Sequence, residues 1–96
     1  MNDTPTPAPT TPGGEAREIL LDIAARLASI RPTHAFTDGR RMAMILTAVT
    51  NRRGYMTDAA DELEAEVLQY APPVDRAITR GEYALILRRS AGGDDE

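Results

Sequence analysis

The sequence EAREILLDIAARLASI, residues 15–30, decides the fold class of this chain. Its large apolar residues recur three or four positions apart, so at about 100° per residue they fall within roughly 100° of arc on a helix. Charged residues such as Glu18, Asp22 and Arg26 occupy the opposite side. The pattern predicts an amphipathic helix over 15–30 that ends before Pro32. Its predicted apolar stripe consists of Ile19, Leu20, Ile23, Leu27 and Ile30.

A second helix is predicted after the loop 32–37. Thr37 or Asp38 can cap its start, because their side-chain oxygens accept hydrogen bonds from free amides of the first turn. Arg53 marks its approximate end, and Gly54 is the expected left-handed terminator. The predicted apolar face consists of Met42, Ile45, Leu46 and Val49.

A third helix is predicted to start at Thr57 or Asp58 and to end at about Tyr70, because Pro72 and Pro73 cannot continue it. The connection around Gly54 is short, so the second and third helices are expected to form an antiparallel hairpin. The residues spaced for the apolar face of the third helix are Ala60, Leu63, Val67 and Tyr70.

The last segment allows two interpretations. Thr79 and Glu82 have the spacing of a capping box, which predicts a short helix over 83–89. The run YALIL over 83–87 is unbroken and apolar, so it could equally form a short buried strand. The helix is the preferred interpretation, and the strand stays open as the alternative.

These elements predict an all-α fold, a small bundle of three longer helices and a short C-terminal helix. The Pro- and Thr-rich segment 1–14 has too few apolar side chains to offset its ordering entropy, so we expect a disordered tail there. Residues 92–96 are expected to be an acidic frayed end. The single folded domain is therefore predicted to span 15–91.

Composition excludes several classes of protein. The chain has 96 residues, a net charge of −4, no Cys and one His, so disulfide frameworks, thiolate metal sites and His-rich zinc sites are ruled out. No run reaches the ~18 apolar residues of a membrane span. All the basic residues are Arg, which is typical of a GC-rich, bacterial genome. Because the sequence contains no membrane-spanning run, we expect a cytoplasmic protein.

No catalytic pattern is present. His34 lies in a loop without positioned companions, and no Gly-rich phosphate-binding motif or nucleophile elbow occurs. The acidic pairs Asp58 with Glu62 and Glu62 with Glu66 share a helix face, but a solvated acidic face explains them better than a metal site. We therefore expect no enzymatic activity, no cofactor, no metal and no small-molecule substrate.

Charge alternates along the chain. The third predicted helix carries five carboxylates and no basic residue, and it lies between two segments rich in Arg. One interpretation is that attraction between these blocks helps to fix which helices pack together, although each exposed ion pair contributes only about 0.2–1 kcal/mol. The other is that the acidic helix forms a surface for a partner.

The preferred functional hypothesis is a non-enzymatic protein-interaction module that binds another protein or, as a homodimer, itself. The turn between the second and third helices combines Arg, Tyr and Met, residue types enriched at interfaces. Apolar residues outside the main stripes, namely Leu21, Met44, Leu68 and one of Leu85 or Ile86, either complete the core or enlarge this surface. The predicted protein-binding residues are Arg52, Arg53, Tyr55, Met56, Glu62 and Glu66.

A small DNA-binding regulator of the helix-turn-helix type is the alternative. It is less favoured because the second helix of the hairpin, which would enter the major groove, is acidic. The alternative requires the arginines of the second and fourth helices to meet on one surface. Its candidate contacts are Arg40, Arg41, Arg76, Arg80, Arg88 and Arg89.

Overall fold

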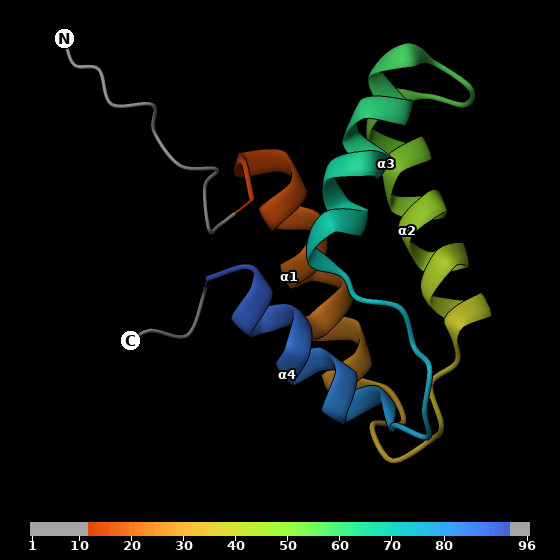
Figure 1. Ribbon diagram of the computed structural model, residues 1–96, viewed down its shortest axis with the longest axis vertical. Coiled ribbons are helices and arrows are strands. Elements are labelled where there is room, and N and C mark those ends of the chain that lie inside the picture. Colours follow the sequence, from red (N-terminus) through yellow and green to blue (C-terminus); the bar gives the residue numbers. More distant parts are fainter. Residues whose placement is uncertain (1–11, 93–96) are drawn as a thin grey trace, which may run out of the picture.

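Helix caps and breakers set the bounds of the secondary structure in this computed structural model, which describes residues 12–92. The described chain forms four helices, α1 (Gly14–Ser29), α2 (Asp38–Arg53), α3 (Asp58–Tyr70) and α4 (Arg80–Ser90) (Figure 1). The prediction of an all-α fold is confirmed. Most of the predicted N-terminal tail and of the acidic end, residues 1–11 and 93–96, lie outside the described residues.

Threonine side chains cap three of the four helices. Thr37 Oγ1 accepts from the Arg40 amide at 3.2 Å, and Thr57 Oγ1 accepts from the Ala60 amide at 2.9 Å. Thr79 completes the predicted capping box, since its hydroxyl accepts from the Glu82 amide at 3.1 Å while the Glu82 carboxylate accepts from the Thr79 amide at 2.8 Å. These bonds satisfy amides that the helix itself leaves free.

The alternative of a strand at 83–87 is wrong, because α4 covers this run. Tyr83, Ala84 and Leu87 are buried and Leu85 is exposed, which is the spacing of one helix face rather than the alternation of a strand. The only bridge between extended residues in 12–92 pairs Ala35 with Thr79, outside this helix.

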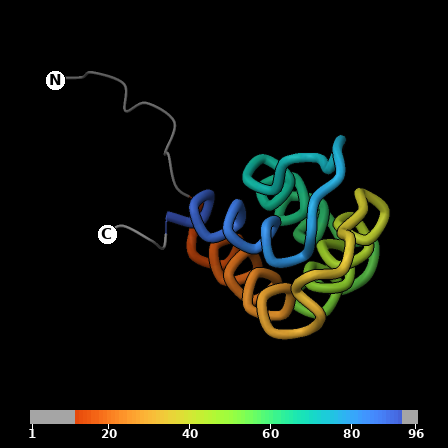
Figure 2. The backbone as a smooth tube through the Cα atoms, turned by 90° about the horizontal axis from the view of Figure 1, so that it is seen from below, coloured from red at the N-terminus to blue at the C-terminus, as the bar shows by residue number. Residues whose placement is uncertain are grey.

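The helices pack as two antiparallel pairs. α2 and α3 form the predicted hairpin, and α1 lies along α4 (Figures 1 and 2). α1 contacts all three other helices, so the core is built around its buried stripe. The α1–α2 loop and the linker before α4 lie at the same end, opposite the hairpin turn. The largest fully buried side chains are Ile19, Leu20, Leu27, Ile45, Val49, Val67, Tyr83 and Leu87.

Two residues predicted on apolar faces are exposed. Ile30 is 54% exposed, because α1 ends at Ser29 and the next residues leave the helical conformation, with φ 51° at Arg31. Leu46 is 48% exposed, because the neighbours of α2 cover less of its circumference than the apolar pattern implied. The residues outside the stripes, Leu21, Met44, Leu68 and Ile86, are partly buried against the core.

The start of α1 is earlier than predicted. Gly14 is its first residue, Gly13 is its N-cap and Pro12 is buried, so these three residues of the segment predicted as tail contact the fold. Gly13 offers no side-chain cap. Its amide instead donates to Glu66 Oε2 of α3 at 2.7 Å. Within the described part of the chain, no helix is both long and apolar enough to cross a membrane.

Candidate functional site

The turn between α2 and α3 displays two large apolar side chains. Tyr55 is 72% exposed and Met56 is 80% exposed. Gly54 (φ 89°) precedes them, and Met56 itself has φ 59°, in the left-handed region that residues other than glycine rarely adopt. On the other side, the Thr57 hydroxyl donates to the Arg53 carbonyl at 2.8 Å. The turn therefore presents both side chains from a backbone that is anchored at each end.

The two arginines at the end of α2, next to this turn, form hydrogen bonds with α1. Arg52 Nη1 donates to Glu18 Oε1 at 2.8 Å, and Arg53 Nε donates to Glu15 Oε1 at 2.9 Å. All four side chains are at least partly exposed, so each pair stabilises the fold by only about 0.2–1 kcal/mol. Arg52 and Arg53, which the sequence places among the binding residues, thus tie the hairpin to α1.

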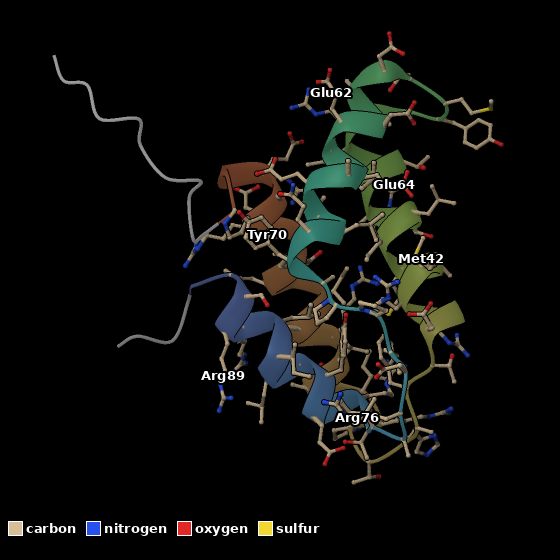
Figure 3. All side chains as sticks on the ribbon, in the orientation of Figure 1. Met42, Glu62, Glu64, Tyr70, Arg76 and Arg89 are labelled. Carbon is tan, nitrogen blue, oxygen red and sulfur yellow. The ribbon has the colours of Figure 1, made fainter. Side chains whose placement is uncertain are left out.

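The acidic face of α3 makes few contacts within the molecule. Among the described residues, no ion pair involves an α3 carboxylate; the inter-helix ion pairs connect α2 with α1. Glu66 accepts the Gly13 amide, whereas Glu62 is exposed near the hairpin end of α3 (Figure 3). Of the six predicted protein-binding residues, Tyr55, Met56 and Glu62 are exposed and their side chains form no hydrogen bond or ion pair in the described structure, whereas Arg52, Arg53 and Glu66 have partners within the fold.

The arginines of the DNA-binding alternative have different environments. Arg41 is only 8% exposed and is bonded within the fold, so it cannot contact a phosphate there. Arg80 Nε donates to the Ile30 carbonyl at 2.9 Å, and Arg76 lies 3.7 Å from the Asp75 carboxylate. Figure 3 shows Arg89 on α4 and Arg76 in the linker before it. Arg40, Arg88 and Arg89 are exposed. DNA binding stays a prediction, and Arg41 is no longer one of its candidate DNA-contacting residues.

A partly buried polar network around Arg41 holds the linker between α3 and α4, and the sequence did not indicate it. Arg41 Nη1 donates to the Ala71 carbonyl at 2.7 Å, and its Nε donates to Asp38 Oδ1 at 2.7 Å. Asp38 Oδ1 also accepts the Val74 amide at 2.9 Å. The Arg41 hydrogen bond and then the Val74 amide hold the pKa of Asp38 below its ordinary value, because both favour the charged carboxylate.

Tyr83 completes this network from α4. Its hydroxyl donates to the Pro72 carbonyl at 2.6 Å, and its ring packs against Phe36 with centroids 4.8 Å apart. Burial raises the pKa of Tyr83 to about 12, because the phenolate would lose its hydration in this position. Tyr83 is thus protonated at neutral pH, and in that form its hydroxyl holds the linker through the Pro72 carbonyl.

Stability should therefore fall as the pH rises from about 10 towards 12. The pKa of Tyr83 in the fold, about 12, exceeds the ordinary tyrosine pKa of 10.0, so its contribution to stability is complete below pH 10 and is lost as the pH rises through the pKa of the folded group. Urea unfolding at about pH 9 and pH 11 should show a larger loss of stability for the natural protein than for Tyr83→Phe. Equal losses in the two proteins would contradict this assignment.

A groove of about 360 Å³ lies between α1 and α2. Apolar side chains, including Ile23, Met44 and Ala48, form part of its lining. Three arginines also line it, Arg26 from α1 and Arg40 and Arg52 from α2, together with one acid, Asp22. Sequence patterns could not reveal this groove, because Arg26 and Arg40 belong to different helices and only the packing brings them together.

His34 is exposed in the loop after α1, where its carbonyl accepts the Arg80 amide at 2.9 Å. In the region 12–92, no group of three or more His, Asp or Glu side chains is placed to hold a metal ion. Comparison with known proteins finds no family model, no curated protein and no solved structure that matches this chain. The assignment of function therefore depends on the surfaces described above.

Proposed function

We propose that this protein is a non-enzymatic interaction module that binds a partner protein through the α2–α3 turn. Tyr55 and Met56 are its apolar anchors, and Glu62 lies on its acidic flank. The observation that carries the proposal is the exposure of two adjacent large apolar side chains, 72% and 80%, on an anchored turn. Such side chains contribute most to binding when a partner's pocket removes them from water.

The backbone of the turn supports this proposal. Met56 has a left-handed conformation, the Gly54 amide donates to the Thr50 carbonyl at 2.9 Å, and the Thr57 side chain caps α3. A surface that is already ordered loses less conformational entropy when it binds. Arg52 and Arg53 contribute by holding the hairpin on α1, and Glu66 contributes by holding the start of α1.

Electrostatics indicate the chemistry of the partner. Glu15 and Glu18 offset the charges of the two arginines, whereas Asp58, Asp61 and Glu62 beside the turn form no ion pair in the described structure. The turn therefore presents two apolar side chains, those of Tyr55 and Met56, next to unpaired carboxylates at the start of α3. A complementary partner has an apolar pocket with a basic rim.

Photo-crosslinking in the producing cells tests the proposal. With p-benzoylphenylalanine in place of Tyr55, we expect a discrete covalent adduct, which Met56→Ser removes while helicity is unchanged. The matched control carries the same crosslinker in place of Leu85, a half-exposed apolar residue on α4. An adduct of the protein with itself identifies a second copy as the partner. No adduct from position 55, or the same adduct from both positions, contradicts the proposal.

A further inference from the structure

The groove between α1 and α2 has the dimensions of an elongated binding site. On α2 its lining extends from Arg40 to Arg52, which at 1.5 Å per residue corresponds to about 18 Å, or roughly three helical turns, whereas on α1 it extends from Asp22 to Arg26, about one turn. A compact anion would occupy only part of this length. A helix lying along the groove would occupy all of it.

The lining of the groove combines apolar contacts with positive charge. Met44 and Ala48, which are partly buried, provide apolar surface next to Ile23 of the core, and methionine adapts well to different ligand shapes. Arg26 and Arg40 are exposed, and within residues 12–92 their guanidinium groups form neither a hydrogen bond nor an ion pair. Arg52, the third arginine of the lining, already forms an ion pair with Glu18. The groove therefore has two cationic side chains that form no ion pair in the described fold, and a single carboxylate, that of Asp22, in the same lining.

We propose that this groove binds an acidic amphipathic helix of a partner protein. Apolar residues of that helix at i, i+3 or i+4, and i+7 would pack between α1 and α2, as in other helix-in-groove complexes. Its carboxylates would pair with Arg26 and Arg40, whose planar guanidinium groups suit bidentate pairing. The site is separate from the Tyr55–Met56 surface and does not depend on the function proposed for the turn.

The experiment is an NMR titration of the isotope-labelled full chain with a synthetic helical peptide of about three turns. The peptide has leucines on one face and glutamate and alanine elsewhere, and a twin peptide has lysine in place of every glutamate. We expect the acidic peptide to shift the amides of α1 and α2 that line the groove and to bind at least about 10-fold more tightly than its twin.

Charge variants locate the binding. Arg26→Gln combined with Arg40→Gln should weaken the acidic peptide about 10-fold, and Asp22→Asn should strengthen it, because Asp22 is the single acid in the lining. The matched control, Arg88→Gln with Arg89→Gln on α4, removes the same charge from two exposed arginines and should change binding less than about twofold.

Three outcomes would overturn the proposal: no binding of the acidic peptide, amide shifts outside the groove, or equal weakening by the two double variants. A duplex DNA that shifts the groove amides when the peptide does not would also overturn it, in favour of phosphate binding. Tyr55→Ser combined with Met56→Ser should leave peptide binding unchanged. The failure of this proposal and the failure of the proposed function are therefore distinguishable.

Discussion

Replacing Arg41 by Met is expected to lower the free energy of unfolding by about 2–3 kcal/mol, because it leaves a buried carbonyl without its donor. The Ala71 carbonyl accepts from Arg41 Nη1 at 2.7 Å, and Ala71 is 1% exposed, so water cannot easily replace the guanidinium. Methionine keeps much of the apolar stem, which limits the loss of packing. Urea unfolding followed by circular dichroism measures the effect.

The neighbouring arginine provides the control. Arg40 is exposed and its side chain makes no hydrogen bond within the described structure, so Arg40→Met should change stability by less than about 0.5 kcal/mol. Both variants lose one positive charge and gain the same side chain. If the two lose the same stability, the Arg41 network does not stabilise the fold, and the linker after α3 is held by other contacts.

Replacing Leu20 by Ala should cost about 3–4 kcal/mol, since the deleted atoms lose their burial and leave a cavity. Leu20 is fully buried on α1, the helix that packs against all three others. A chain of this size is stable by only about 5–10 kcal/mol, so the variant should unfold at markedly lower temperature. Thermal unfolding followed by circular dichroism measures the change.

Leu85→Ala is the matched control for this second substitution. It removes the same atoms from a leucine of α4 that is half exposed, so its cost should stay below about 1 kcal/mol. A similar loss for both leucines would mean that Leu85 is covered, for example by association of the chain with a partner. In that case the loss at Leu85 should depend on protein concentration.

The helices could be predicted from the sequence because their signals are local. Threonine caps, Gly54 and the prolines after Tyr70 act on their own neighbours, and the bounds of α2 and α3 follow from them, whereas α4 extends beyond the predicted 83–89 at both ends. The exposure of Ile30 and Leu46 could not be predicted in this way. It depends on how much of each helix its neighbours cover, which apolar spacing within one helix does not determine.

For the candidate sites too, local sequence signals do not determine which side chains the folded protein exposes. Arg40 and Arg41 are adjacent in the sequence and chemically identical, yet one lines an open groove and the other is buried. Their difference arises from a carbonyl thirty residues further along the chain, at Ala71. Tyr55 and Met56 could be identified beforehand because a short turn between two capped helices exposes its side chains whatever the rest of the fold does.

The pairing of α1 with α4 affects the order in which parts of the chain fold. Arg17 Nε donates to the Ala91 carbonyl at 3.0 Å, across a sequence separation of 74 residues, whereas the α2–α3 hairpin closes over a few residues. Loop-closure entropy rises with the length of the closed segment, and contacts between distant residues slow folding. The hairpin can therefore form on its own early, but the core around α1 is complete only when the two ends of the described chain have met.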